Sequence, residues 1–205
     1  MPRARLYNTY DKTLLYLMLA FLAAHLVNHL ALVFGQATHI QLMDQLRVLY
    51  RFPILEALLI WVIARQVWAG IKQMRRFGPL KSKGRYRVLV WSSLNLIFFL
   101  IIYLSAVAGG RWVLGLDTNI FFGGAGINVW PYALIFHTYY FLAAFCVLAH
   151  LGTVIWLRQR AAAPIFADQF YKGSLALGLI VAVLINLSLS GVLSDIVIPE
   201  AYLAQ

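Results

Sequence analysis

Acidic residues and cysteine are scarce in this sequence. Its 205 residues include seven Asp and Glu, one Cys and six Pro, and charged residues make up 12% of the chain. A soluble domain carries roughly a quarter charged residues, so this chain lacks the polar surface of a water-facing globule. The lone Cys146 has no partner for an intrachain disulfide and no CxxC neighbour, which argues against an iron–sulfur or zinc site.

Hydrophobic residues make up 62% of the chain and gather in long runs. A helix that crosses a bilayer needs about 20 apolar residues, and helices satisfy every backbone group within their own segment. The first run is too long for a signal-peptide core, so it is kept as a span. The sequence therefore predicts an all-α integral membrane bundle of five transmembrane helices, forming a single domain over residues 1–205. The approximate spans are residues 13–34, 53–74, 88–108, 131–157 and 173–192.

The basic residues predict the direction of the chain, which has a formal net charge of +10. Lys and Arg concentrate in the N-terminal segment, in the link "KQMRRFGPLKSKGRYR" and in the link after the fourth run, whereas the other side has only Arg47, Arg51 and Arg111. By the positive-inside rule, the N-terminus is cytoplasmic and the C-terminus outside, in a bacterial-type inner (cytoplasmic) membrane. This topology explains the positive net charge, so no nucleic-acid partner is needed to account for it. It is compatible with binding of anionic membrane lipid or of an acidic partner.

Two outer links contain more than a turn. The segment "THIQLMDQLRVLYRF" spaces apolar residues at helical intervals, which predicts a short amphipathic helix on the outer surface. The segment "GGRWVLGLDTNIFFGGAGINVWP" combines glycines with aromatic residues. It is expected to fold back over the bundle at the membrane interface, where tryptophan is favoured.

Four of the five histidines fall within apolar runs, where ionisable side chains are rare and are by default candidates for a functional site. They are His25 and His29 in the first run, and His137 and His150 in the fourth. With a rise of about 1.5 Å per residue, His29 and His137 both lie roughly 9 Å inside the outer boundary. His25 lies one turn deeper, on the same helix face as His29. The alternative function of these side chains is interhelical hydrogen bonding.

Two histidines that face each other from different helices, at one depth and among aliphatic residues, form the ligand arrangement of a bis-histidine b-type haem. Two of the four histidines would bind the haem iron, and the bundle core would hold the macrocycle. Zinc is disfavoured because no carboxylate lies at that depth. A proton relay would be expected to include acids.

The first two runs resemble the opening of a known family. The segments "LYLMLAFLAAHLVNHLALVFGQATHIQLMDQLR" and "ILEALLIWVIARQVWAGIK" are similar to the five-helix cytochrome b membrane-anchor subunit of the succinate dehydrogenase/fumarate reductase (complex II) family. His25, Gly35 and Glu56 match the family pattern, and His29 stands where the family often has Asn. The segment "VLAHLG" around His150 resembles the His-Leu segment of the family's fourth span.

The resemblance implies a haem-b subunit that binds quinone and docks iron–sulfur and flavoprotein subunits, or another redox complex, on the cytoplasmic side. It carries His25 and His150 over as axial ligands. The depth of the residues in the membrane instead favours His29 and His137 as the two ligands. A modest tilt of the helices would also allow His25 and His137 to form the pair. The sequence leaves this choice open.

The second run departs from the family pattern. Arg65 and Gln66 stand where a histidine would be expected, so one haem, or none in a diverged member, is predicted in place of two. Arg65 could pair with a haem propionate or a quinone oxygen. The alternative for this long side chain is to snorkel to the inner surface.

Candidates for quinone contacts come from the outer links. His39 and Asp44 could accept the protons that a quinol releases. The simpler interpretation is a surface histidine and a solvated acid. Trp112 and Trp130 could line a quinone pocket, although anchoring at the membrane interface is the more common function of such residues.

The sequence contains no flavin, nicotinamide or iron–sulfur motif, so any dehydrogenase chemistry would belong to partner subunits. The leading hypothesis is a haem-b-binding, quinone-reactive membrane anchor subunit that passes electrons between quinone and a partner redox protein. Such a subunit is not a complete enzyme alone. The alternative is a haemless structural or assembly subunit of a larger respiratory or photosynthetic membrane complex. A small transporter is disfavoured because no internal repeat is visible.

Overall fold

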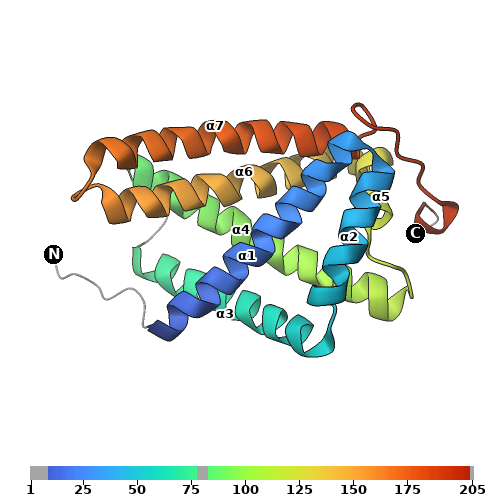
Figure 1. Ribbon diagram of the computed structural model, residues 1–205, viewed down its shortest axis with the longest axis horizontal. Coiled ribbons are helices and arrows are strands. Elements are labelled where there is room, and N and C mark those ends of the chain that lie inside the picture. Colours follow the sequence, from blue (N-terminus) through green and yellow to red (C-terminus); the bar gives the residue numbers. More distant parts are fainter. Residues whose placement is uncertain (1–8, 78–82, 204–205) are drawn as a thin grey trace.

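The computed structural model describes residues 9–77 and 83–203, and all regular elements in these ranges are helical (Figure 1). Five of the helices are long and apolar enough to cross a membrane, which confirms the predicted all-α class and the number of spans. Arg3, Arg5 and Lys81, on which the predicted direction of the chain partly depends, lie outside the described residues. The five helices are α1 (Thr9–Ala31), α3 (Pro53–Phe77), α4 (Arg85–Ala108), α6 (Tyr132–Gln159) and α7 (Pro164–Leu189).

The ends of the first four spans agree with the sequence prediction to within a few residues, and the start of the fifth does not. The sequence predicts a start near Gly173 with Lys172 as a flank, whereas α7 begins at Pro164. Proline suits the first helical turn, where no amide hydrogen is needed. Lys172 lies within the helix, and its Nζ is 2.8 Å from the Oδ2 of Asp168 one turn earlier. Charges spaced in this way support a continuing helix.

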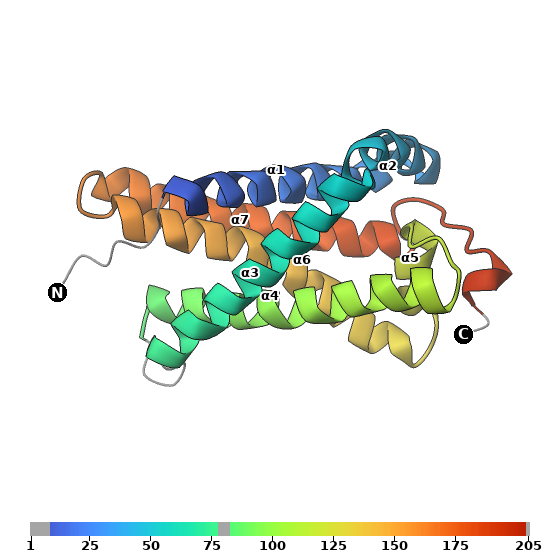
Figure 2. The same ribbon diagram turned by 90° about the horizontal axis from the view of Figure 1, so that it is seen from below.

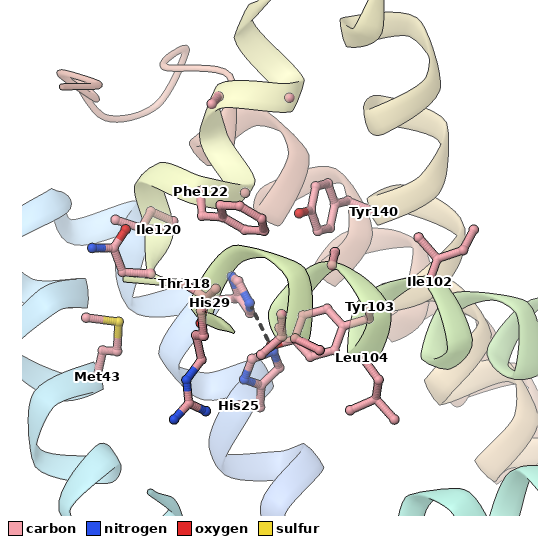
Figure 3. A pocket seen from close by; sticks show the side chains of 18 of the residues that line it. His25, His29, Met43, Ile102, Tyr103, Leu104, Thr118, Ile120, Phe122 and Tyr140 are labelled. Carbon is pink, nitrogen blue, oxygen red and sulfur yellow. Dashed lines mark hydrogen bonds between the residues drawn. The ribbon is translucent and has the colours of Figure 1, made fainter. Parts of the chain in front are cut away.

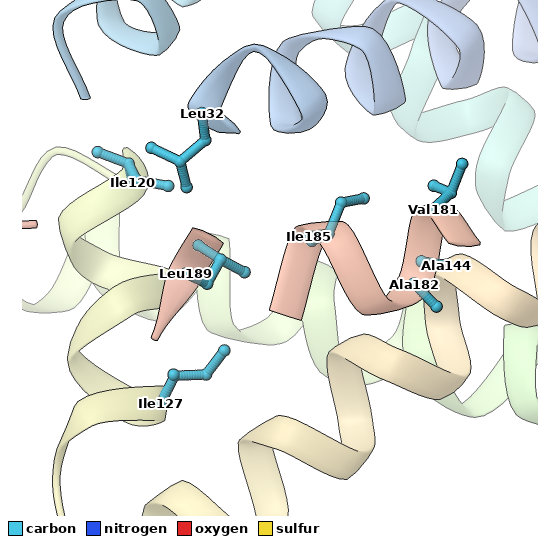
Figure 4. Close-up of a cluster of buried hydrophobic side chains, with 8 residues drawn as sticks. All are labelled: Leu32, Ile120, Ile127, Ala144, Val181, Ala182, Ile185 and Leu189. Atoms are coloured by element: carbon cyan, nitrogen blue, oxygen red, sulfur yellow. The ribbon is translucent and has the colours of Figure 1, made fainter. Parts of the chain in front are cut away.

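Helices α6 and α7 pack closely because small residues lie between them. Ala182 is fully buried, and a Cβ placed on Gly178 would lie 3.2 Å from the carbonyl oxygen of Phe145. At one end of this helix pair, apolar side chains from four elements form the hydrophobic core (Figure 4). The core consists of Leu32, Ile120, Ile127, Ala144, Val181, Ala182, Ile185 and Leu189.

Short elements close the same end of the bundle, which is termed the capped end. Helix α2 (Gln36–Tyr50) follows Gly35, whose φ of 111° is accessible to glycine without a Cβ penalty. It supplies the amphipathic helix that the sequence predicts. Helix α5 (Ile120–Asn128) begins at Asn119, whose side chain accepts a hydrogen bond from the backbone N–H of Phe121. The C-terminal segment, residues 190–203, lies at this end as well (Figure 1).

Helices α3 and α4 cross, and toward the capped end they separate (Figure 2). They are in close contact where a Cβ on Gly70 would lie 2.9 Å from the Cδ1 of Ile97. Beyond α4 the chain makes a π-helical turn, η3 (Gly109–Val113), and Arg111 of this turn forms an ion pair with Glu56 of α3. Single π-helical turns are frequent at functional sites. The separation of the two helices leaves room for a cavity.

Candidate functional site

A cavity of about 440 Å³ lies at the capped end, with walls from α1 to α6 and from Leu189 at the end of α7. Its lining is mainly aliphatic and aromatic, and it also includes polar side chains and four charged ones, three Arg and Glu56. An apolar cavity with polar groups that fix orientation is typical of a small-molecule site. Three histidines contribute to the lining: His25 and His29 from α1, which Figure 3 shows, and His39 from α2. We refer to it as the histidine cavity.

His25 and His29 lie one helical turn apart, and their Nε2 atoms are 3.2 Å from each other (Figure 3). For this contact to be a hydrogen bond between neutral rings, one ring must carry its proton on Nε2 and the other on Nδ1. The Nδ1 atom of His29 is buried and has no hydrogen-bond partner among the described residues. An unsatisfied buried polar atom costs about 1–3 kcal/mol. It is therefore a point at which a bound molecule would gain a hydrogen bond.

Asn28 and His39 extend this polar wall. His39 is only 2% exposed, and its Nδ1 donates to the backbone carbonyl of Asn28 over 2.7 Å. The neutral ring therefore keeps an Nε2 that can accept a proton. Burial lowers the pKa of His39, the Asn28 carbonyl opposes this effect, and the charge of Arg47 lowers the pKa further. The expectation of a surface histidine at this position is wrong, because α2 turns this face toward α1.

Asn28 contributes a second unsatisfied atom. Its side chain is 5% exposed, and its Oδ1 is buried without a hydrogen-bond partner among the described residues. Asn28 also lines the histidine cavity. From the sequence, Asn28 is most simply an interhelical hydrogen bonder and was not a candidate site residue, although it lies next to His29 within the same apolar run.

Aromatic rings face the histidines from other helices. The ring centroid of Tyr103 on α4 is 6.1 Å from that of His25. Figure 3 shows the rings of Phe122 and Tyr140 across the open space from the histidine pair. The sequence analysis did not identify Tyr103 or Tyr140. The signal that could have found them is a hydroxyl-bearing ring within an apolar run, on the same side of the membrane as His29.

Ion pairs and the C-terminal segment cover the cavity. Asp117 Oδ2 is 2.8 Å from Arg47 and Asp117 Oδ1 is 2.9 Å from Arg51. Partial burial raises the pKa of Asp117, but hydrogen bonds from the two guanidinium groups outweigh this effect and hold it below its usual value. Tyr202 donates its hydroxyl to the backbone carbonyl of Asp117 over 2.9 Å. Tyr202 and Leu203 both line the cavity.

His137 and His150 do not line the histidine cavity. The Nδ1 of His137 is 2.7 Å from the Oδ1 of Asn186 on α7, and the Nδ2 of Asn186 donates to the backbone carbonyl of His137 over 3.3 Å. The Nδ1 of His150 is 3.2 Å from the Oγ of Ser93 on α4. Each of these two histidines therefore joins α6 to a neighbouring helix.

The remaining predicted site residues are divided between the cavity and the surface. Trp112 lines the cavity, although it is 75% exposed. Trp130 and Asp44 are exposed and lie outside the lining. Arg65 is exposed on α3, and its guanidinium lies 5.6 Å from the ring centroid of Trp61. Of these four residues, only Trp112 shares the cavity lining with the histidines.

A bis-histidine haem needs imidazole nitrogens on opposite faces of one macrocycle. His25 and His29 share one face of α1 with their Nε2 atoms in contact, so these two rings do not provide such a pair. Among the described residues, no ring contact joins His137 or His150 to another histidine. The arrangement does not fit a haem held between two of these four histidines in the histidine cavity. The described residues also contain no group of three or more His, Cys, Asp or Glu that could hold a metal ion.

The fold and the cavity define a class: an all-helical, multi-pass membrane protein with a ligand-sized, histidine-lined cavity at one end of its helices. No family model matches the chain, and no significant match was found among curated proteins or among solved structures. The resemblance to the complex II anchor subunits stays a prediction that is based on the quoted segments.

Proposed function

We propose that this chain is a quinone-reactive subunit of a membrane electron-transfer complex, and that quinone binds in the histidine cavity. The observation that carries the proposal is the pair of buried, unsatisfied atoms, Asn28 Oδ1 and His29 Nδ1, in an otherwise mainly apolar cavity. A quinone has two carbonyl acceptors on an apolar ring, and its reduced form has two hydroxyl donors. A ligand that changes between acceptor and donor matches a wall of histidine and asparagine side chains.

The chemistry requires two electrons and two protons for each quinone that becomes a quinol. Imidazole is the side chain whose ordinary pKa allows proton transfer near neutral pH. The ring centroids of His29 and His39 are 5.7 Å apart. His39, as a proton acceptor, therefore lies beside the ring whose Nδ1 would bind the quinone oxygen. In this proposal the chain binds the ring and moves its protons. The electrons pass to or from a partner redox protein.

The partner would dock at the end opposite to the cavity. Positively charged side chains stand at that end, among them Arg75, Lys83 and Arg160, and all three are exposed. Under the positive-inside rule this end faces the cytoplasm, and the capped end faces outside. The complex II resemblance implies iron–sulfur and flavoprotein subunits as the partners. Haem b stays a prediction of the sequence, and a pyridine haemochrome assay on the purified protein tests it.

A second candidate function is that of a haemless structural or assembly subunit. The observation that favours it is the use of His137 and His150 as interhelical hydrogen bonders, with Asn186 and Ser93 as partners. Such bonds hold membrane helices together without any redox role. This function requires no ligand in the histidine cavity, so a binding measurement separates the two candidates.

The test is isothermal titration of the purified protein in lipid nanodiscs with a tailless 1,4-benzoquinone and a tailless 1,4-naphthoquinone. We expect saturable binding of at least one ring. His29→Leu should weaken it about tenfold, because one hydrogen bond of about 1.4 kcal/mol is lost. The matched control is His137→Leu, which removes a histidine at similar depth outside the cavity and should leave the affinity unchanged. Absence of binding by the unaltered protein, or equal effects of the two substitutions, would contradict the proposal.

A further inference from the structure

Residues of α3 and α4 that line the histidine cavity are also exposed on the outside of the helix bundle. Ile60 on α3 and Ile102 on α4 both line the cavity, and their side chains are 41% and 39% exposed. Both residues belong to helices that are long and apolar enough to cross a membrane. Ile60 lies seven residues after Pro53, which is roughly 10 Å along the helix. This part of the lining, termed the α3–α4 opening, therefore lies at the depth of the hydrocarbon chains and not at the water surface.

The boundaries of this α3–α4 opening are set by two contacts. On one side the helices meet where Gly70 lies against Ile97. On the other side the ion pair between Glu56 and Arg111 joins α3 to the π-helical turn. Between these contacts the helices separate toward the capped end (Figure 2). The cavity lining contributed here is aliphatic apart from Tyr103, and its aliphatic members include Leu59, Ile60, Ile63, Ile102, Leu104, Ala106 and Val107.

Several segments at the capped end are fastened to one another by hydrogen bonds and an ion pair. The backbone N–H of Val197 donates to Gln36 Oε1 over 3.1 Å, which ties the C-terminal segment to α2. The hydroxyl of Tyr202 bonds the carbonyl of Asp117, and Asp117 in turn pairs with Arg47. The lining at the capped end is thus held by polar contacts, whereas the lining between α3 and α4 is apolar and includes two exposed isoleucines.

We propose that the α3–α4 opening is the entrance for the ligand of the histidine cavity and the groove that holds the ligand's hydrocarbon tail. This inference rests on the proposed function. The polar ring lies against His29 and Asn28, and the tail leaves between Ile60 and Ile102 into the bilayer. Lipid is as apolar as the groove, so the tail gains little affinity from being transferred between them. The opening matters instead for its shape. The ring of a tailed quinone can reach the histidines only if its tail can extend through the opening into the bilayer.

The experiment compares one quinone ring with and without a tail. The probes are 2-methyl-1,4-naphthoquinone and the same ring with a four-isoprene tail, each titrated into the full chain in nanodiscs. If the benzoquinone ring is the one that binds, the matched tailless and tailed benzoquinones are used. Two variants, Ile60→Trp and Ile102→Trp, fill the opening from opposite helices. Their controls are Leu58→Trp and Ile101→Trp, which add the same ring to neighbouring exposed positions outside the cavity lining.

We expect each opening variant to raise the Kd of the tailed quinone at least tenfold and to change the Kd of the tailless ring less than twofold. The two controls should bind both probes as the unaltered protein does. Because the variants lie on different helices, misfolding of one of them leaves the other as the test. Unchanged binding of the tailed quinone by both opening variants, or equal weakening of both probes, overturns the inference. Failure of the unaltered protein to bind any tailless ring overturns the proposed function itself.

Discussion

The two halves of this molecule are packed in opposite ways. Helices α6 and α7 meet through small residues: a Cβ on Gly152 would lie 2.5 Å from the Cβ of Ser174, and Ala182 is fully buried. Helices α1, α3 and α4 surround a cavity of about 440 Å³ together with the short elements of the capped end and the first turns of α6. Close packing through small residues is one of the main contributions to helix association in membranes. One half therefore provides stability, and the other half keeps space for a ligand.

The largest expected effect comes from breaking the packed half. Gly152→Ala should lower the free energy of unfolding by about 1–3 kcal/mol or more, because the new methyl group overlaps Ser174. The matched change Gly173→Ala, at a helical glycine with nothing near its Cβ position, should be neutral or raise stability by up to about 1 kcal/mol. A thiol-reactive dye measures both, because the only cysteine, Cys146, is buried in α6. Equal melting temperatures of the two variants would contradict the comparison.

The second effect distinguishes the histidines of the two halves. His137→Leu and Asn186→Leu should each lower stability by about 1 kcal/mol, and the double variant should lose less than the sum. His29→Leu should change stability by less than about 0.5 kcal/mol, because it removes an unsatisfied nitrogen together with one hydrogen bond. The same melting assay measures all four proteins. A larger loss for His29→Leu than for His137→Leu would show that the cavity histidine is the structural one.

The third effect concerns pH and the cavity half. Burial and Arg47 hold the pKa of His39 below its ordinary 6.5. Just below pH 6.5, His39 therefore stays neutral in the folded protein, whereas it binds a proton in the unfolded chain. The stability contributed by neutral His39 is therefore complete above pH 6.5 and decreases as the pH falls toward the lowered pKa. His39→Gln should make the decline of melting temperature below pH 6.5 shallower. A variant with the same slope as the unaltered protein would exclude His39 as a source of the decline.

The smallest effect concerns the cover of the cavity. The pKa of Asp117 is lowered, so its ion pairs contribute above its ordinary pKa of 3.8 and are lost as the pH falls through the lowered value. Because its side chain is 41% exposed, Asp117→Asn should cost only about 0.5–1 kcal/mol at neutral pH, and less at high salt. The control Asp44→Asn alters a carboxylate that is 63% exposed and 3.9 Å from Arg47. Melting curves at two salt concentrations should show a salt-sensitive loss for Asp117→Asn alone.

Sequence alone predicts the spans well, because length and apolar composition are properties of each segment by itself. It misses the start of α7, since Lys172 looks like a flank although its partner Asp168 lies on the same helix. Depth within the membrane is also a property of one segment, so His29 and His137 can be placed at similar depth from the sequence. The direction in which each side chain points is not such a property. His137 faces Asn186 on α7, and His29 faces the cavity.

The site was only partly predictable for the same reason. His25 and His29 are apparent as polar residues in an apolar run, and the structure places both in the cavity lining. The burial of His39 depends on how α2 packs against α1, and the contribution of Tyr103 depends on how far α4 stands from α1. These relations between helices are absent from any one segment of sequence. They explain why an amphipathic pattern suggested a surface histidine where a buried one is found.

The division into two halves has a consequence for biosynthesis. A chain enters the membrane from its N-terminus, so α1, α3 and α4 are inserted before α6 and α7 exist. Yet Leu32, directly after α1, is fully buried in a core that is built largely from α7 and α5. The helices that surround the cavity therefore enter the bilayer before the core that buries Leu32 is formed. We expect the end of α1 to reach its final packing only after α7 has been inserted.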